Sequence, residues 1–187
     1  MTNLATIKRH PERAVPDEAA DILSHGLVAH VGFAQDGQPV VIPLAYHYDP
    51  ATPDIIYLHG SLASRTLRHV AAGNPVCITV TMLDGLVYSR AAENHSINYR
   101  CVVCFGRGVS ILSDAEKEAR FGAMTSRYIP GRTVGEDYAP PTAAQLRGVL
   151  MVAVQIEEMS AKARRGGPLG PLDNDPDAPG SSGVVEL

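Results

Sequence analysis

The side chains best suited to chemistry in this sequence are hydroxyls and guanidinium groups that follow a single glycine. Residues 59–68 read His-Gly-Ser-Leu-Ala-Ser-Arg-Thr-Leu-Arg, which brings Ser61, Ser64, Arg65 and Arg68 close together. Hydroxyls, an arginine fork and free backbone N–H groups at a helix start are groups that bind phosphate in proteins. The segment therefore suggests an anion site. The alternative is an ordinary helix start capped by Ser61 with solvated arginines, and this segment alone favours that alternative.

The pattern of apolar residues places this segment between a strand and a helix. Residues 54–58 end in four consecutive residues typical of a strand, Ile-Ile-Tyr-Leu. Beyond the serines, apolar residues recur at helical spacing, at Ala63, Leu67, Val70 and Ala71. The sequence Gly-Asn-Pro at residues 73–75 then ends the predicted helix.

The remaining elements are mostly strands joined by short turns. Asp36-Gly37 and Asp84-Gly85 predict tight turns, and Pro43 predicts an edge strand or a bulge. Gly106 and Gly108 predict a bend within a long strand. The other predicted strands cover residues 27–34, 39–48, 76–82, 86–90, 97–112 and 149–156. Helices are predicted near 16–23 and 113–128, and another short helix starts at Thr142. This order predicts a mainly β protein with added helices, built as an antiparallel barrel.

The length of 187 residues suits one domain. We expect an irregular N-terminal arm at residues 1–15, a folded domain at 16–165, and a flexible tail at 166–187 that is rich in Pro and Gly. No apolar run reaches the roughly 20 residues of a membrane helix. The first residues show no secretory signal, so the expected location is the cytoplasm.

The charge and the cysteines exclude several classes of function. A net charge of -4 argues against a nucleic-acid-binding protein, which usually has a basic face. Cys101 and Cys104 form a C-x-x-C pattern, but on a strand residues i and i+3 point to opposite faces. We therefore expect buried thiols rather than a disulfide or a metal site, and the sequence predicts no metal ligands.

Several short segments, taken in their order along the chain, resemble one known family. They are Pro43-Leu44-Ala45-Tyr46, the Ile-Tyr-Leu-His-Gly-Ser of residues 56–61, the Ser-Arg-Thr of 64–66, the Gly-Asn-Pro of 73–75, and the Asn-Tyr-Arg-Cys-Val-Val-Cys-Phe-Gly of 98–106. Together they resemble the flavin-binding split barrels related to pyridoxamine 5'-phosphate oxidase. The most similar branch is that of the nitroimidazole-resistance proteins, and the resemblance covers residues 17–164.

This resemblance implies a homodimer of split barrels with FMN held in clefts between the subunits. The phosphate and ribityl chain would be lined by Leu58, His59, Gly60, Ser61, Ser64, Arg65 and Thr66. The edge of the flavin ring would run along Ile42, Pro43 and Leu44, and the far side of the cleft would hold Asn98, Tyr99 and Arg100. A basic segment with Lys162 and Arg164 would approach the cofactor of the other subunit.

The chain also departs from the oxidases of that family. They carry a basic residue directly after Ser-Arg, where this chain has Thr66, and a basic pattern on the earlier strand, where residues 41–45 are apolar. The chain also lacks tryptophan. Oxidation of pyridoxamine phosphate is therefore not the predicted activity.

The sequence and the resemblance together predict an FMN-dependent oxidoreductase that reduces small electron-poor compounds such as nitroaromatics or quinones. FMN would supply the redox chemistry, and no catalytic residue is assigned. One alternative is a flavin carrier or sensor without turnover. Another is a haem or a deazaflavin in the same fold, and His59, His69 and His95 are the candidate haem ligands.

Overall fold

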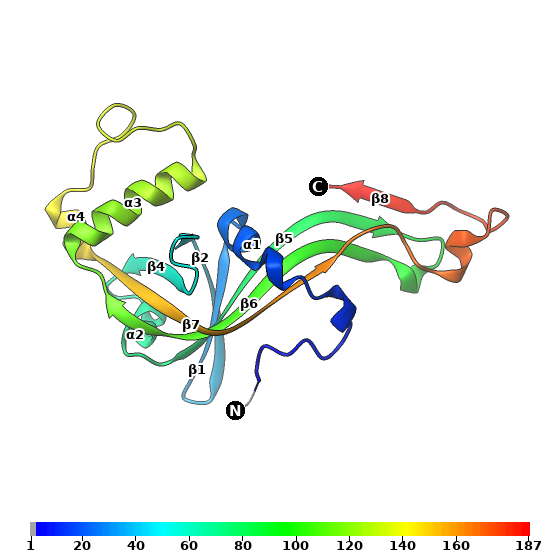
Figure 1. The fold of residues 1–187 in the computed structure, drawn as a ribbon, viewed down its shortest axis with the longest axis horizontal. Helices are drawn as coiled ribbons and strands as arrows, with labels where there is room; N and C mark the ends of the chain where they lie inside the picture. Colours follow the sequence, from blue (N-terminus) through cyan, green and yellow to red (C-terminus); the bar gives the residue numbers. More distant parts are fainter. Residues whose placement is uncertain (1–2) are drawn as a thin grey trace.

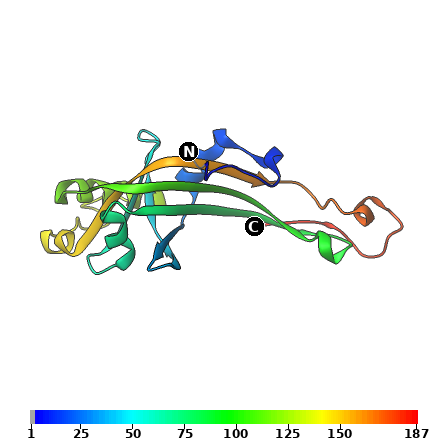
Figure 2. The ribbon, with the colours of Figure 1, turned by 90° about the horizontal axis from the view of Figure 1, so that it is seen from below.

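The computed structural model describes residues 3–187 and is built around three long antiparallel strands. These are β5 (Pro75–Tyr88), β6 (Ser96–Ile111) and β7 (Val149–Arg164), which run along the long axis of the molecule (Figures 1 and 2). Shorter strands extend the sheet on both sides, namely β1 (Ala29–Gln35), β2 (Gln38–Leu44), β3 (Tyr46–Tyr48) and β4 (Ile55–Ser61).

The strand order makes the sheet an incompletely closed barrel. Neighbouring strands follow the order β2-β1-β5-β6-β7-β4-β3, and all of the pairs are antiparallel. The two ends of this order, β2 and β3, are joined through Ala45 alone, so the sheet has to curl back toward itself. The predicted fold class, an antiparallel split barrel with added helices, is confirmed.

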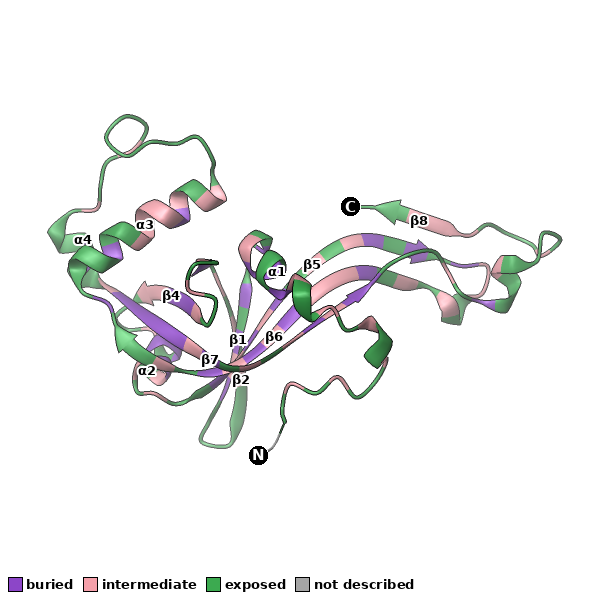
Figure 3. Cartoon of the chain, viewed as in Figure 1, coloured by how far each residue is buried: buried purple, intermediate pink, exposed green. Residues whose placement is uncertain are grey.

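The main core lies on the concave face of this sheet. Alternate residues of each strand point inward, as the two-residue period of a strand requires. The buried set includes Val31, Ile56, Leu58, Ile78, Val80, Val102 and Val154. Helix α1 (Ala19–His25) adds Ile22 and Leu23, and α2 (Arg65–Ala71) adds Leu67 and Val70. In Figure 3 the buried residues follow the central strands, whereas the helical end and the tail are mostly exposed.

A second, smaller apolar cluster lies beneath α3 (Asp114–Tyr128). It contains Tyr57, Leu112, Met151 and Ala153, with Phe121 of α3 packed against them. Ser113 caps this helix in the predicted capping box, because its hydroxyl accepts from the Glu116 N–H while the Glu116 carboxylate accepts from the Ser113 N–H at 2.7 Å. A second capping box begins α4 (Ala143–Gly148), also as predicted. Both helices lie at one end of the molecule (Figure 1).

The ends of the chain pack against the long strands. Residues 3–15 include a 3-10 turn at Pro11–Arg13, and another at Pro16–Glu18 leads into α1. The predicted flexible tail instead contains a 3-10 turn at Pro171–Asn174 and a strand, β8 (Gly183–Glu186), that pairs with β5. Residues 183–186 of the tail, whose composition suggests flexibility or order only against a partner, are thus paired with the free edge of β5.

Several local predictions were right and others were wrong. Pro43 lies on the edge strand β2, as expected. Asp84-Gly85 forms a bulge inside a continuous β5 instead of a turn. Strand β7 continues eight residues beyond its predicted end at residue 156, because β6 pairs with it along nearly its whole length. Among residues 3–187, no helix has the length and apolar content needed to cross a membrane.

Candidate functional site

The turn between β4 and α2 carries the hydroxyls and arginines that the sequence pointed to. Strand β4 continues through His59 and Gly60 to Ser61, so this part of the motif is strand rather than loop. The Ser61 hydroxyl accepts from the Ala63 N–H at 3.1 Å, and the Ser64 hydroxyl accepts from the Leu67 N–H at 3.3 Å. The N-cap of α2 is therefore Ser64, and the capping role considered for Ser61 is wrong.

The two arginines at this turn have different surroundings. Arg68 folds back over the turn, where its Nε donates to the Leu62 carbonyl at 2.9 Å. Arg65 is exposed, and within residues 3–187 its guanidinium has no hydrogen-bond or ion-pair partner. Ser61 is also exposed. An exposed guanidinium and an exposed hydroxyl at one turn are both available to an anionic ligand.

Two residues predicted to line this site face the core instead. Leu58 is 0% exposed and Thr66 is 2% exposed. Leu58 alternates with Tyr57 and His59 along β4, so it points to the concave face, and Thr66 lies beside Leu67 on the inner side of α2. Side chains that are buried without a ligand have no surface left for one. Within this chain, any contact of these two residues with a ligand would therefore be through the backbone.

His59 points to the opposite face of β4, beneath α3. Its ring meets Phe121 edge-to-face with the centroids 5.3 Å apart, and its Nδ1 is buried with no hydrogen-bond partner among the described residues. Burial lowers the pKa of His59, which favours the neutral ring. His47 on the neighbouring strand β3 lies diagonally across from it. His59 is therefore a packed, uncharged imidazole at this position.

The second group of predicted residues lies far along the sheet, on β6 and β7. Arg100 donates to both carboxylate oxygens of Asp84, with the shortest contact 2.7 Å, and lies 3.7 Å from Asp21. This pairing lowers the pKa of the Asp84 carboxyl and raises that of Arg100. The charge of Arg100 is thus engaged by an anionic partner within the chain.

Arg164, Asn98 and Lys162 are also engaged by neighbouring backbone or side chains. Arg164 is 6% exposed, and its guanidinium donates to the Asn98 side-chain oxygen and to the carbonyls of Gly166 and Gly167. Asn98 is 8% exposed. Lys162 donates to the Arg9 carbonyl at 2.7 Å. Within this chain these residues stabilise the junction between the N-terminal segment, the sheet and the C-terminal tail, and they do not form an open binding surface.

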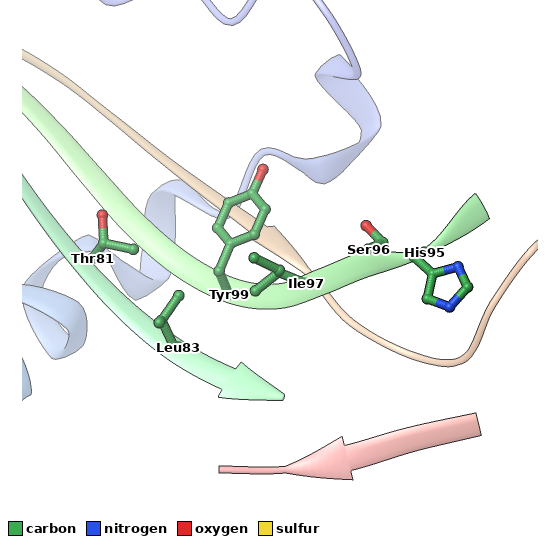
Figure 4. A pocket seen from close by; sticks show the side chains of 6 residues that line it. All are labelled: Thr81, Leu83, His95, Ser96, Ile97 and Tyr99. Carbon is green, nitrogen blue, oxygen red and sulfur yellow. The ribbon is translucent and has the colours of Figure 1, made fainter. Parts of the chain in front are cut away.

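Tyr99 faces outward into a shallow hollow on the arm formed by β5 and β6. The hollow has a volume of about 620 Å³ and is lined by Thr81, Leu83, His95, Ser96, Ile97 and Tyr99. Figure 4 shows these side chains along the two strands, with the His95 ring at one end. Leu83 is 55% exposed and Ile97 is 43% exposed, so the floor is apolar. His95 is one of the candidate haem ligands named from the sequence, but it is not among the residues predicted to bind FMN.

Residues 42–44 lie on the edge strand β2. Ile42 pairs with Val31, and Leu44 pairs with Ala29. Pro43 is exposed, while Ile42 and Leu44 are half-buried. The contacts predicted between these three residues and the edge of the flavin ring are backbone contacts. An edge strand leaves backbone groups accessible for such contacts.

The predicted site residues therefore fall into separate groups within one chain. Gly60 pairs with Leu150 of β7, whereas Tyr99 pairs with Arg164 at the other end of the same strand. Fourteen residues separate those two positions on β7, or roughly 45 Å of strand at the usual rise per residue. One flavin cannot touch both groups of the same chain.

Comparisons with known proteins agree on the kind of fold. The sequence profile of the pyridoxamine 5'-phosphate oxidase family matches residues 16–163. No curated protein matches the chain by sequence.

Three solved structures illustrate the structural similarity. The FAD and haem binding protein from Mycobacterium smegmatis is 33% identical, with a TM-score of 0.79 over 93% of this chain and 82% of that one. The flavocytochrome Anf3 from Azotobacter vinelandii is 31% identical, with a TM-score of 0.82 over 98% of this chain and 83% of that one. A candidate 5-nitroimidazole antibiotic resistance protein from Bacteroides thetaiotaomicron is 21% identical, with a TM-score of 0.62 over 80% of this chain and 84% of that one, which supports the fold alone.

Proposed function

The chain belongs to the pyridoxamine 5'-phosphate oxidase family of split barrels, and on that premise we propose that it is a flavin-binding oxidoreductase acting as a homodimer. The observation that carries the proposal is that Arg65 and Ser61 are both exposed at the turn between β4 and α2, with the Arg65 guanidinium available to a ligand.

The residues at this turn fit the phosphate of a flavin nucleotide. A phosphate dianion accepts two parallel hydrogen bonds from an arginine, and such charge-assisted bonds are stronger than neutral ones. Arg65 would supply this pair, and Ser61 a further hydroxyl. FMN and FAD share the phosphate next to the ribityl chain. FMN is the form predicted from the sequence, and the Mycobacterium smegmatis relative is named for FAD.

The proposed dimer follows from the separation of the site residues. The turn after β4 and the hollow beside Tyr99 lie too far apart in one chain to share a ligand. A second copy that places its β5–β6 arm beside the first copy's turn would bring the two together. The arm suits this role because Leu83, Leu86 and Ile97 are each more than 40% exposed, an apolar surface that a monomer would leave in water.

When bound, the flavin would supply the transfer of a hydride or of single electrons. The protein's part would be to bind and orient it. Arg65 would neutralise the phosphate, and the apolar Leu83 and Ile97 would exclude water from one side of the cleft. This lining carries few charges, which suits uncharged, electron-poor substrates of the nitroaromatic or quinone type.

Haem is a second candidate cofactor. It is favoured by a specific observation, since two relatives above 30% identity are named as a FAD and haem binding protein and as a flavocytochrome. The apolar hollow beside His95 fits a flat macrocycle better than a charged ligand.

The proposal is tested by the visible spectrum of the purified protein before and after titration with FMN and, separately, with FAD. We expect a flavin spectrum and a tight complex that weakens in Arg65→Ala but not in Arg147→Ala, an exposed arginine on α4. Reduction of the bound flavin by a nicotinamide donor, with onward transfer to a nitroaromatic compound, would establish the enzyme. Bound flavin that no donor reduces would favour a carrier or sensor, and no flavin binding would refute the proposal.

A further inference from the structure

A second hollow, here called the α3 hollow, lies between α3 and the outer face of strands β4, β6 and β7 (Figure 1). Its volume is about 450 Å³, which is within the range of small-molecule sites. Ala119 of α3 and Ala153 of β7 both line it, and their short side chains leave room between the helix and the sheet. Most of the remaining lining is apolar, from Ile55, Val109 and Leu112.

Two polar side chains meet at this hollow, Tyr57 from β4 and Arg120 from α3. The Arg120 Nη2 donates to the Tyr57 hydroxyl at 3.0 Å, and the guanidinium carbon lies 4.2 Å from the centre of the Tyr57 ring. The Arg120 Nη1 also donates to the Asp49 carboxylate at 3.3 Å. The guanidinium is therefore held in one orientation by a ring, a hydroxyl and a carboxylate.

Both side chains have hydrogen-bond donors to spare. A guanidinium has five N–H groups, and the two hydrogen bonds of Arg120 use only two of them. The Tyr57 hydroxyl accepts from Arg120, but among residues 3–187 its own hydrogen has no acceptor, although Tyr57 is only 8% exposed. A buried donor without an acceptor is unfavourable, and a ligand that brings an acceptor would remove this cost.

The acidic side chain at the hollow does not supply that acceptor. Glu116 lines the α3 hollow, but its carboxylate accepts from the Ser113 N–H at 2.7 Å and from the Ser113 hydroxyl at 2.6 Å. Ser110 adds an exposed hydroxyl to the lining. The polar groups left over at the hollow are therefore mainly donors, one of them carrying a positive charge.

We propose that the α3 hollow binds a small organic carboxylate with an apolar body, for which benzoate is the model compound. The carboxylate would accept from Arg120 and Tyr57 in charge-assisted hydrogen bonds. The apolar body would lie against the residues between Ala119 and Ala153. An inorganic anion would leave this apolar part unfilled, and a neutral amide would bring donors that find no free acceptor.

This site is separate from the proposed flavin site. None of the residues that line the α3 hollow belongs to the turn with Ser61 and Arg65. Ser61 lies four residues beyond Tyr57 on β4, or roughly 13 Å of strand. The proposal therefore goes beyond the flavin-dependent activity and does not depend on it.

The experiment titrates the purified full-length protein with benzoate by isothermal calorimetry, once alone and once with FMN in excess. Benzamide, which has the same shape without the charge, and inorganic phosphate are titrated in parallel. NMR shifts of the backbone amides of Ala119, Arg120 and Ala153 then report where benzoate binds. We expect benzoate to bind with and without FMN, to shift these three amides, and to bind more tightly than benzamide or phosphate.

The variants separate the charge from the packing. Arg120→Gln should weaken benzoate binding roughly tenfold or more, because a hydrogen bond to a charged group is lost. Tyr57→Phe keeps the buried ring and removes only the hydroxyl, so binding should weaken by about two- to tenfold. The matched control is Arg107→Gln, because Arg107 is also paired with a carboxylate, that of Glu157 at 3.1 Å, but does not line the hollow. It should leave benzoate binding unchanged.

Four results would overturn the proposal. They are no benzoate binding, equal binding of benzamide, unchanged affinity in both Arg120→Gln and Tyr57→Phe, and displacement of benzoate by FMN. Displacement would place the benzoate at the flavin site. If Arg120→Gln does not fold, Tyr57→Phe and the NMR shifts still decide the matter. Flavin binding is measured by its own spectrum, so this proposal and the flavin proposal can fail separately.

Discussion

The burial of His47 predicts that the protein loses stability under mildly acidic conditions. His47 lies on β3 and is 5% exposed, and its ring is tilted against Tyr57 with the centroids 5.9 Å apart. Among the described residues neither ring nitrogen has a hydrogen-bond partner. Burial, with smaller contributions from Arg120 and Arg127, lowers the pKa of His47, while Asp49 opposes this effect. The folded protein therefore holds this ring neutral.

The sign and size of the effect follow from proton linkage. The unfolded chain binds one more proton than the folded chain once the pH falls below the ordinary histidine pKa of 6.5. The free energy of unfolding is therefore undiminished above that pH. It decreases at lower pH, by up to about 1.4 kcal/mol per pH unit, until the pKa of the folded state is reached. His59 has the same sign, because burial lowers its pKa too.

Carboxylates act in a different pH range. Asp49 and Asp84 have a lowered pKa in the folded protein, so their contributions are present above the ordinary aspartate value of 3.8 and are lost below it. Measurements between about pH 7.5 and pH 5.5 therefore isolate the histidines.

The assay is urea unfolding at several pH values in that range, for the wild type and for His47→Phe. The phenylalanine removes both unpartnered nitrogens and the titration, so its free energy of unfolding should depend less on pH, by up to about 1.4 kcal/mol per unit. His30→Phe, at an exposed position on β1, is the control and should keep the wild-type slope. Equal slopes in the wild type and His47→Phe would refute the reasoning.

Three further predictions test the site and the packing. Arg65→Ala should weaken FMN binding by about 1.5–3 kcal/mol, the usual contribution of hydrogen bonds to a charged group, and leave riboflavin binding unchanged in a fluorescence titration. Gly108→Ala should cost about 3 kcal/mol, because an added Cβ would lie 2.1 Å from the Val70 carbonyl oxygen. Calorimetry should then show a melting temperature lower by roughly 10 °C, with little change for Gly122→Ala at an open position of α3. Burial raises the pKa of the Cys104 thiol to about 12, so a thiol reagent near neutral pH should modify it only at the rate of unfolding, and faster modification would contradict its burial.

The sequence was informative about the fold wherever a local rule and the tertiary structure agree. Pro43 lacks a backbone N–H, which restricts it to an edge, and β2 is an edge strand. Gly106 marks a register shift between β6 and β7, where a Cβ would lie 2.0 Å from the Gln155 carbonyl oxygen. The capping box at Ser113 begins α3 where predicted. Each of these features is set by one or two residues and their own backbone.

The incorrect predictions share a different cause. Asp84-Gly85 is a favourable turn sequence, yet here Asp84 forms an ion pair with Arg100 and the strand continues through a bulge. The far half of β7 contains Glu157, Glu158 and Lys162. These polar residues interrupt the apolar pattern by which a strand is predicted, although the segment pairs with β6. Long-range pairing decided both cases. No local pattern reports on a partner that lies tens of residues away in the sequence.

The same limit applies to the candidate site. The motif was sufficient to locate Arg65 and Ser61 at a turn. It did not show which way each side chain points, and in the structure Leu58 of β4 and Thr66 of α2 face the core. The order of the segments identified the family without revealing that Arg164 is held by backbone carbonyls. Orientation depends on register, and register becomes known only when the sheet is assembled.

The length of β7 connects the fold to the proposed activity. A compact barrel would need only the first half of this strand, where β4 pairs with it through Ser61. Its second half pairs with β6, is bridged by Ala14 of the N-terminal segment, and supports an arm whose outer surface exposes Leu83 and Ile97. Exposed apolar surface is unfavourable in water, so an arm of this kind is explained best by something that covers it. A second subunit and a cofactor would both do so, and together they would complete a site that one chain divides between two distant ends.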